Sequence, residues 1–421
     1  MSATMAEEKN LSDHLTERDH KKLGRELGLF TFSDAVGKGL PLWTAKGSAI
    51  RRELERFIID EEILRGYQHV YTPDIAKLDL YRKSGHYPHY KDSMYAPIQI
   101  DDEEYMLRPM TCPHHFELYL DRPHSYRELP MRIAELAKLY RYEQSGELMG
   151  LQRVRTFCLA DAHIICASEE QAAEEVSSAL DLIVYVASVF GLKQNNQYHF
   201  RLSLGDRANT EKYYKNDSAW EKGEILLRTL LQKRGEKFEE VKNEAAFYGP
   251  KIDIQMKNAN GKEDTAFTVQ YDFCMPEKFN LDYVAQDGSK NRAFVVHRSS
   301  IGAIERIVAF LIEHYAGAFP LWLSPVQVKI LPISEKHAGY AKEIFQQFLV
   351  AGIRTELDQN DALGKRIRNT KLQKVPYFLV IGDEEVDAGT ATLEGRIGKI
   401  GSFAISDIVH RLKEEIRTRA M

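Results

Sequence analysis

The sequence predicts an α+β fold class in two parts, in which long helices and antiparallel hairpins are followed by a small α/β domain. Apolar residues recur at helical spacing within residues 47–68, which predicts a long amphipathic helix. Two alternating runs meet at Asn260-Gly261, a pair that strongly favours a hairpin turn. After about residue 324, strand-like and helix-like segments alternate, which is typical of a mainly parallel sheet. We therefore expect a domain boundary near Ser324-Pro325.

Length, charge and cysteine content narrow the class of protein. The 421 residues are enough for two or three domains, and the net charge of -5 argues against a generally basic nucleic-acid-binding surface, although a local basic groove stays compatible with it. No apolar run approaches the roughly 18 residues of a membrane span, and the polar, acidic start is unlike a signal peptide. The four cysteines form no C-x-x-C pair, which favours free thiols in a reducing, cytoplasmic compartment.

The first part is expected to begin with a polar lead-in over residues 1–18 and to continue with the long helix, which Gly66 ends. The apolar face of that helix is formed by Ile50, Leu54, Phe57 and Ile58. The next elements, in order, are a strand over 69–75 that Pro73 stops, a helix from Glu169 to Gly191, a hairpin over 251–273, and a strand leading into an apolar helix over 292–317.

The second part alternates strands and helices to the end of the chain. The predicted strands cover residues 326–333, 354–359 and 377–382, and the predicted helices cover 338–352, 363–373 and 404–419. Helices between strands are the connections that a parallel sheet needs.

Two charged arms, residues 139–143 and 153–163, indicate a binding site for an anion. If they pair as antiparallel strands, Arg141 and Glu143 share one face of the first arm. The corresponding face of the second arm carries Arg153, Arg155, Phe157, Leu159, Asp161 and His163. The arginines near the loop would suit a polyphosphate, because arginine forks bind phosphate oxygens in pairs, and the Asp and His at the far end would suit an ammonium or a metal. A solvated face with surface ion pairs is the alternative.

Arg306 is a second sign of an anion. It lies in "IGAIERIVAFLI", a predicted helix whose other residues are nearly all apolar. Burying an unpaired guanidinium is costly, so we expect an anionic partner, either Glu305 or a bound phosphate.

Several stretches together resemble the threonyl-tRNA synthetases, a family of class II aminoacyl-tRNA synthetases. "RYEQSGELMGLQRVR" is similar to motif 2 of that class, "HRSSIGAIER" is similar to motif 3, and the long helix, strand and Pro73 are similar to motif 1, which forms the homodimer interface. The stretches that resemble the threonine enzymes in particular are "LRPMTCPHH", "SGHYPHYKD", "ADAHIIC", "AFYGPKID" and "SPVQVKI". The resemblance covers residues 19–421. It implies a class II catalytic core over 19–323, built on a six-stranded antiparallel sheet flanked by helices, and an α/β anticodon-binding domain over 324–421.

The resemblance implies ATP-dependent ligation of L-threonine to tRNA(Thr) through a threonyl-adenylate. Arg141 and Glu143 are implied to hold the α-phosphate and the adenine amino group, and Arg153 and Arg306 to hold the γ-phosphate side of ATP with Mg²⁺. The threonine carboxylate would attack the α-phosphorus, and fixed cations would stabilise the charge that develops. His86 is implied to help deprotonate the terminal ribose hydroxyl of the tRNA, with a surface histidine in a loop as the alternative.

Cys112, His163 and His297 align with the zinc ligands of the family, one ion per chain. Three protein ligands leave coordination positions open, and the resemblance implies that threonine fills them with its amino nitrogen and its hydroxyl. Valine has a methyl group in place of that hydroxyl, so a metal rejects it where an apolar pocket would discriminate only roughly a hundredfold. The alternative is that all three are ordinary buried residues.

The remaining pocket residues follow from the same resemblance. Asp161 is implied to take the substrate ammonium, and the other threonine-pocket positions are Met110, Tyr248 and Gln270. Leu159 stands where many relatives have a glutamine, and Thr265 falls near another usual glutamine.

The anticodon-facing positions depart more from the family pattern. Asn360, Arg368 and Glu385 are implied to face the RNA. Glu394 occupies the place of an expected arginine, and Arg396, two residues on, would share its face if the register shifted.

Full-length relatives usually carry a small N-terminal domain and an editing domain ahead of the core, whereas about 18 residues precede it here. Either the natural protein lacks these domains, or this sequence is a part of a longer protein. Serine also offers an amino group and a hydroxyl, so zinc excludes it poorly. We expect this chain to transfer serine to tRNA(Thr) without correcting the error. Failure to detect Ser-tRNA at saturating serine would contradict this expectation.

Two other functions are compatible with the same scaffold. A silent paralogue that binds RNA or a partner would typically have lost a motif arginine or a pocket ligand, and Arg141, Arg306 and the Cys/His/His set are all present. A ligase for proline or serine is the other possibility, and proline has no hydroxyl for a metal to hold. Amino-acid-dependent exchange of pyrophosphate into ATP separates the three.

Overall fold

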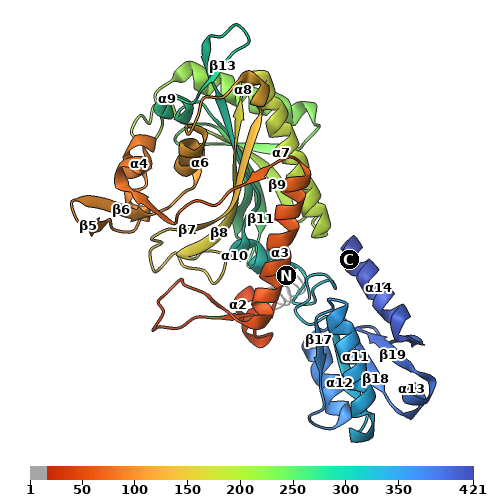
Figure 1. Ribbon diagram of the computed structural model, residues 1–421. Helices are drawn as coiled ribbons and strands as arrows, with labels where there is room; N and C mark the ends of the chain where they lie inside the picture. Colours follow the sequence, from red (N-terminus) through yellow and green to blue (C-terminus); the bar gives the residue numbers. More distant parts are fainter. Residues whose placement is uncertain (1–16) are drawn as a thin grey trace, which may run out of the picture. The chain divides into compact units, whose positions relative to one another are not determined.

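The computed structural model describes residues 17–421, which divide into two compact units (Figure 1). The larger unit comprises residues 32–40 and 55–307, and the smaller comprises 17–31, 41–54 and 308–421. The division falls within helices α3 (Ala45–Leu64) and α10 (Ile304–His314). The lead-in expected over residues 1–18 lies almost wholly outside the described residues. Among residues 17–421, none of the helices has the length and apolar character that crossing a membrane requires.

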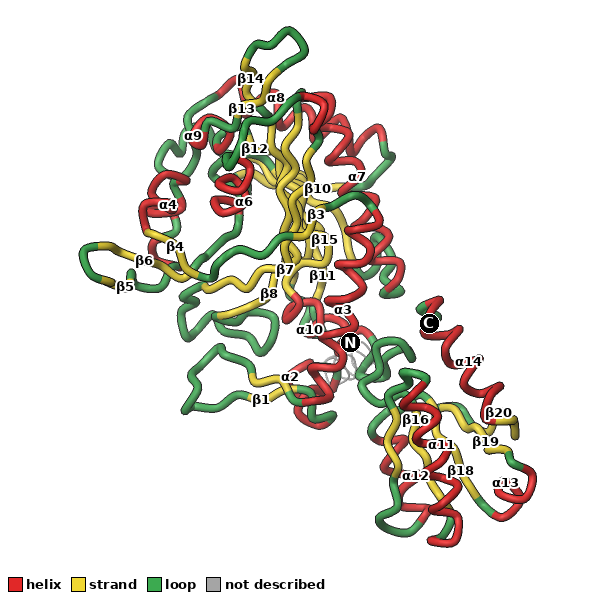
Figure 2. Tube along the Cα trace, in the orientation of Figure 1, coloured by secondary structure: helices red, strands yellow, loops and turns green. Residues whose placement is uncertain are grey.

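An eight-stranded sheet forms the centre of the larger unit (Figure 2). Its strands, in spatial order, are β10 (Phe238–Lys242), β9 (Tyr198–Leu204), β11 (Lys251–Lys257), β12 (Glu263–Asp272), β15 (Phe294–Ala303), β8 (Thr156–Cys166), β7 (Met131–Tyr140) and β3 (Gln68–His69). The six strands from β9 to β7 pair antiparallel throughout, which confirms the expected core. The edge strands β10 and β3 add in parallel, and the resemblance did not include them.

The predicted helices and hairpin of this unit are present. Helix α7 (Glu169–Val189) begins at Ser168, whose side chain accepts a hydrogen bond from the Gln171 amide, and its apolar face packs on β8, β12 and β15. Figure 1 shows α7 on one side of the sheet and α4, α6 and α9 on the other. The other helices of the unit are α4 (Leu78–Ser84), α5 (His86–His89), α6 (Cys112–Tyr119), α8 (Asp217–Lys233) and α9 (Met275–Phe279).

The strand expected over 69–75 is shorter than predicted. β3 ends at His69, because the chain then turns and Thr72 donates its hydroxyl to the Glu135 carboxylate on β7. Residues beyond Pro73 form part of a separate three-stranded sheet, β4-β6-β5. Its strands are β4 (Ile75–Lys77), β6 (Glu103–Leu107) and β5 (Ile98–Ile100), and a two-stranded hairpin of β13 (Asp282–Val284) and β14 (Lys290–Arg292) lies elsewhere in the unit.

A buried ion pair joins the end of α3 to β15. The Arg298 guanidinium donates to Glu62 at 2.6 Å, and both side chains are almost fully buried. The Ser300 hydroxyl donates to the same carboxylate at 2.6 Å, and His69 lies 2.8 Å from its second oxygen. The Arg298 guanidinium also lies 4.1 Å above the Tyr67 ring. Removing either charge would leave the other buried without compensation.

We expect Glu62→Gln to lower the free energy of unfolding by about 3 kcal/mol, because Arg298 would keep its charge without a carboxylate. Urea denaturation measures the change. Glu117→Gln is the matched control, since Glu117 pairs with Lys83 at 2.9 Å on the surface, and it should change stability by less than about 0.5 kcal/mol. Equal effects of the two variants would contradict the expectation.

A five-stranded sheet in the order β17-β16-β18-β19-β20 forms the centre of the smaller unit. The pairs of β16 with β17 and β18 are parallel, whereas β18-β19 and β19-β20 are antiparallel. The expectation of a mainly parallel sheet is therefore wrong for half of the pairings. Strands β19 and β20 and the short helix α13 were not predicted from the residue pattern, because these segments are short and rich in glycine or charge.

The predicted alternation of strands and helices is otherwise confirmed, with ends that differ by a few residues. The strands are β16 (Val328–Pro332), β17 (Thr355–Leu357), β18 (Tyr377–Ile381), β19 (Thr390–Gly395) and β20 (Lys399–Ala404). The helices are α11 (Ala338–Val350), α12 (Leu363–Leu372), α13 (Asp383–Ala388) and α14 (Ile405–Thr418). The unit also holds α2 (His20–Glu26), β1 (Phe30–Thr31) and β2 (Leu42–Trp43).

Candidate active site and metal centre

A pocket of about 200 Å³ lies over β8, β12 and β15 of the larger unit. The sequence-predicted residues that line it are Met110, Arg141, Glu143, Arg153, Leu159, Asp161, Tyr248, Thr265, Gln270, His297 and Arg306. These positions span almost 200 residues of sequence, and the antiparallel pairing of neighbouring strands brings them together. The adjoining cavity of about 430 Å³ shares part of this lining and adds His86, Lys212 and Lys251.

Gly302 sets the direction in which the chain leaves β15 and enters α10. The register of β15 against β8 shifts between Ser299 and Ala303, and Gly302 adopts φ = +72° within the irregular stretch. A Cβ at this position would lie 2.0 Å from the Ala266 carbonyl oxygen, so only glycine fits. The close approach brings α10 and Arg306 to the rim of the pocket.

Arg306 is enclosed by protein, and its tip opens into the pocket. Its guanidinium donates to the carbonyl oxygens of Gln152 at 3.1 Å and Thr265 at 2.6 Å. Within residues 17–421 it makes no ion pair with a carboxylate, and Glu305 instead accepts from the Cys158 amide at 2.8 Å. The expectation of Glu305 as its partner is therefore wrong, which leaves a bound anion as the remaining candidate.

Two further arginines face the same part of the pocket. Burial lowers the pKa of Arg306, and the charges of Arg141 and Arg153 lower it further, against the opposing charge of Asp264. Burial also lowers the pKa of Arg141, whose guanidinium lies 5.0 Å from the Phe157 ring. Glu143 offsets part of the effect on both Arg306 and Arg141, but no carboxylate forms an ion pair with any of the three arginines within residues 17–421. Three crowded cations without ion-pair partners are typical of a site that receives a polyanion.

Arg155 does not share this face, contrary to the expectation. Its guanidinium lies 5.0 Å from the Tyr142 ring and donates to the Glu143 carbonyl at 3.0 Å. The predicted alternation fails here because β7 ends at Tyr140 and β8 begins at Thr156. The charged residues at 141–155 thus lie in the connecting segment, where a period of two no longer holds.

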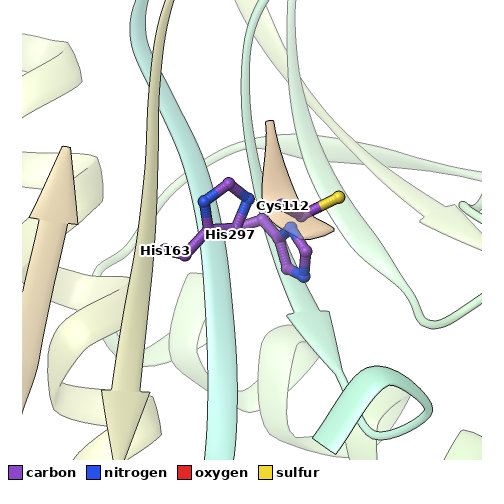
Figure 3. A group of neighbouring side chains, drawn as sticks. All are labelled: Cys112, His163 and His297. Carbon is purple, nitrogen blue, oxygen red and sulfur yellow. The ribbon is translucent and has the colours of Figure 1, made fainter. Parts of the chain in front are cut away.

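Cys112, His163 and His297 lie close together beside the pocket, and His297 also lines it (Figure 3). Cys112 is the first residue of α6, and the two histidines are cross-strand partners on β8 and β15. Their candidate ligand atoms all lie within 4.8 Å of one another, and all three side chains are buried. One thiol and two imidazoles are a donor set that suits zinc.

The hydrogen bonds of the two imidazoles fit metal binding. In each ring one nitrogen is engaged: His163 Nδ1 lies 2.8 Å from His115 Nδ1, and His297 Nε2 lies 2.7 Å from the Asp272 carboxylate. The other nitrogens, His163 Nε2 and His297 Nδ1, are buried without a hydrogen-bond partner. An engaged outer nitrogen and a free inner one are the usual pattern of histidine ligands.

The Cys112 thiol is the third candidate metal ligand, and its surroundings also favour a bound cation. Burial raises the pKa of its thiol well above the usual value, and Asp161 and Asp272 raise it further. A cation between the three side chains would offset both effects and favour the thiolate.

Asp161 and Tyr248 lie beside the cluster. Asp161 accepts a hydrogen bond from the Thr111 hydroxyl, and burial raises the pKa of its carboxyl. Tyr248 donates to the Gln270 side-chain oxygen, and its ring stacks on His297 with centroids 4.8 Å apart. Together with Met110, which lies 2.9 Å from the Arg141 guanidinium, they form a small polar chamber between the metal cluster and the arginines.

His86 is buried at 1% exposure, so its interpretation as a surface histidine is wrong. Its Nδ1 lies 2.8 Å from the Ser84 hydroxyl, and its Nε2 lies 3.7 Å from Cys112 Sγ. Burial and the neighbouring His297 lower the pKa of His86 to about 3, so the ring is neutral at pH 7.

The anticodon candidates lie in the smaller unit. Asn360 and Arg368 are exposed, whereas both Glu385 carboxylate oxygens accept hydrogen bonds, from the Gly382 amide at 2.9 Å and the Thr392 hydroxyl at 2.6 Å. Arg396 follows the end of β19 and donates to the carbonyls of Lys374 and Phe319. Arg396 therefore does not share a strand face with Glu394, because β19 ends before it.

The residues behind the metal cluster were not predicted from the sequence. His115 and Asp272 each contact a candidate ligand, and Glu135 contacts His115. One signal was available: in "CPHH", the second histidine stands three residues after Cys112 and so shares its side of a helix. No comparable signal marked Glu135, whose position depends on strand pairing.

Comparisons with known proteins agree with this geometry. Residues 95–315 match the family described as "tRNA synthetase class II core domain (G, H, P, S and T)", and residues 327–415 match "Anticodon binding domain". The chain is 48% identical over 405 residues to a "Threonine--tRNA ligase" of Geobacillus sp. (strain WCH70), covering 95% of this chain and 62% of the relative. It is 50% identical over 413 residues to the same-named protein of Geobacillus kaustophilus (strain HTA426), covering 97% and 63%. The chain thus spans a little under two thirds of the length of these relatives.

A solved structure extends the comparison to the fold. The crystal structure of the "RNA binding domain of Threonyl-tRNA synthetase" from Cryptosporidium parvum Iowa II superposes with a TM-score of 0.88 at 34% identity. The match covers 94% of this chain and 98% of that one. The chain therefore belongs to the class II aminoacyl-tRNA synthetases, within the threonyl-tRNA synthetase family.

Proposed function

We propose that this chain uses ATP to join L-threonine to tRNA(Thr) through a threonyl-adenylate, with zinc-mediated recognition of threonine. The observation that carries the proposal is a pocket of about 200 Å³ that is lined both by three arginines and by His297, a member of the buried metal-ligating cluster. None of these arginines, Arg141, Arg153 and Arg306, forms an ion pair with a carboxylate within residues 17–421. A pocket of this composition suits an amino acid at one end and a polyphosphate at the other.

The arginine end supports a role in nucleotide binding. Arg141 is set to hold the α-phosphate, and Glu143 the adenine amino group. Arg153 and Arg306 then face the γ-phosphate side, where Mg²⁺ would accompany ATP. Because Arg306 is already fixed by two backbone carbonyls, it needs little rearrangement to stabilise charge that develops during the reaction.

The opposite end supports selection of the amino acid. A zinc ion on Cys112, His163 and His297 would recognise a substrate that offers both an amino nitrogen and a side-chain hydroxyl. Asp161 would take the ammonium, and Tyr248, Gln270 and Met110 would enclose the rest of the small side chain. The threonine carboxylate would then point toward Arg141.

The adjoining cavity of about 430 Å³ supports entry of the tRNA 3′ end. It is lined by His86, which would help deprotonate the terminal ribose hydroxyl, and by Lys212 and Lys251, which suit a phosphate backbone. Asn360, Arg368 and Glu385 are part of the same proposal as anticodon contacts, although Glu385 would have to give up hydrogen bonds within its own domain.

Homodimerisation through motif 1 and a cytoplasmic location complete the proposal. Large apolar side chains near Pro73 are exposed, with Leu64 at 79% and Tyr71 at 89%. Exposed apolar side chains of this size suit burial against a second copy. We expect Tyr71→Asp to shift sedimentation from dimer toward monomer.

Amino-acid-dependent exchange of pyrophosphate into ATP tests the function. Threonine should support the fastest exchange, serine a slower one, and proline and valine little above the background without amino acid. Faster exchange with proline than with threonine, or no exchange with any amino acid, would contradict the proposal.

A further inference from the structure

Behind the candidate ligand His163 lies a second histidine, followed by a carboxylate. His163 Nδ1 lies 2.8 Å from His115 Nδ1, and His115 Nε2 lies 3.2 Å from Glu135 Oε2. His163 and His115 are fully buried, and Glu135 is 2% exposed. The three side chains come from β8, α6 and β7, so secondary structure fixes each of them.

Glu135 determines where the protons lie in this row of hydrogen-bonded side chains, His163, His115 and Glu135. Two ring nitrogens 2.8 Å apart share one proton, which belongs either to His163 or to His115. If both rings are neutral and His115 carries it, His115 Nε2 has a lone pair that faces the Glu135 lone pairs, which is repulsive. If His163 carries it, His115 Nε2 keeps its own proton and donates it to Glu135. Only this second arrangement leaves the lone pair of His163 on Nε2, the buried nitrogen that has no hydrogen-bond partner and is available to a metal.

The Glu135 carboxylate, the last acceptor in this row of side chains, is fixed by further contacts. Its carboxylate pairs with Arg108 at 3.0 Å and accepts the Thr72 hydroxyl at 2.7 Å. Burial alone would raise the pKa of Glu135, but hydrogen bonds from His115 and Thr72 and the charge of Arg108 lower it overall. The group therefore stays a carboxylate at neutral pH and can only accept.

We propose that His115 and Glu135 are positioning residues that fix the tautomer and the ring orientation of His163 for metal binding. The inference rests on the proposed function, in which Cys112, His163 and His297 hold zinc. His297 is held directly by the Asp272 carboxylate at 2.7 Å, whereas His163 is held by a carboxylate acting through a second imidazole. Helix α6 thus contributes two residues to the metal site: Cys112 is a ligand, and His115 contacts the ligand His163 from behind.

Zinc affinity of the purified 421-residue chain tests the inference, measured by competition with a chromophoric chelator. Loss of outer hydrogen bonds to ligands typically weakens metal binding by about 10–100-fold, and we expect this range for His115→Leu. His115→Asn keeps an acceptor at the position of Nδ1 and should recover part of the loss. Glu135→Gln should fall between the wild type and His115→Leu, because an amide no longer selects one tautomer of His115.

His114→Leu is the matched control. His114 is the adjacent residue of the same helix and is also buried, but its ring lies near Tyr81, with centroids 6.3 Å apart. This variant should bind zinc within about twofold of the wild type, since it leaves the outer hydrogen bonds of the ligands intact.

The absorption spectrum of the Co²⁺-loaded protein gives a second readout, because it reports ligand geometry. We expect a changed spectrum for His115→Leu and a wild-type spectrum for His114→Leu. Should His115→Leu fail to fold, as judged by thermal unfolding, the comparison of His115→Asn and Glu135→Gln with the control decides. Wild-type affinity and spectrum in all His115 and Glu135 variants would overturn the inference alone. A wild-type chain that binds no zinc would overturn it together with the metal part of the proposed function.

Discussion

Removal of zinc is expected to lower threonine-dependent pyrophosphate exchange by at least about a hundredfold and to reduce the preference for threonine over valine to about a hundredfold or less. A pocket without the metal would have to distinguish a hydroxyl from a methyl group by shape alone, which yields only weak discrimination. Asp161 and Tyr248, the polar pocket residues beside the cluster, are already engaged with Thr111 and Gln270. Exchange is measured on protein treated with a chelator and then freed of it.

The control for this experiment is the restoration of metals one at a time. Mg²⁺ and ATP are supplied to the stripped protein first, so that only the Cys112, His163 and His297 site remains empty. Addition of stoichiometric Zn²⁺ should then restore activity and selectivity. A stripped protein that activates threonine at the original rate, and still rejects valine, would show that the cluster has no part in recognition.

Arg306→Met is expected to reduce pyrophosphate exchange by about 10²–10³, the usual cost of losing one preorganised group that stabilises developing charge. Stability should respond differently. Arg306 has no carboxylate partner within the described chain, and burial lowers its pKa, so the fold gains little from its charge. We expect a melting temperature equal to or above that of the wild type, and a smaller rise on adding ATP.

Arg155→Met is the matched control for Arg306→Met. Arg155 also lies between β7 and β8, but its guanidinium rests on Tyr142 outside the pocket. Its loss should change exchange by no more than about threefold. Equal losses in the two variants, or a large loss of stability for Arg306→Met, would indicate that the arginines act on the fold instead of the nucleotide.

Much of the fold could be predicted because its signals are local. The helix from Glu169 has a serine cap and an apolar face, and the Asn260-Gly261 turn fixes a hairpin. The strand pair β19-β20 has no such signal, since both strands are short, contain many polar residues and are interrupted by glycine. β19 and β20 are neighbours in sequence, but side-chain packing decides whether such short segments form strands, and their periodicity does not reveal it.

The candidate site likewise contains residues that could be predicted from the sequence and residues that could not. Resemblance marked Cys112, His163 and His297, and the strand register then explains their proximity. Arg155 was misplaced because alternation was extended beyond the ends of the strands. Of the two candidate partners of Arg306, Glu305 and a bound phosphate, Glu305 is excluded, because adjacent residues on a helix point in different directions. Glu135 could not be found, because its contact with His115 depends on how β7 and α6 pack.

His163 and His297 face each other directly across two neighbouring strands. A slip of one residue between these strands would turn one imidazole to the opposite side of the sheet. A misfolded chain of that kind would keep its secondary structure and lose one of three donors. The amount of zinc bound per chain therefore reports whether β8 and β15 pair in the correct register. A preparation that binds one zinc ion per chain has these strands correctly aligned, which circular dichroism alone would not detect.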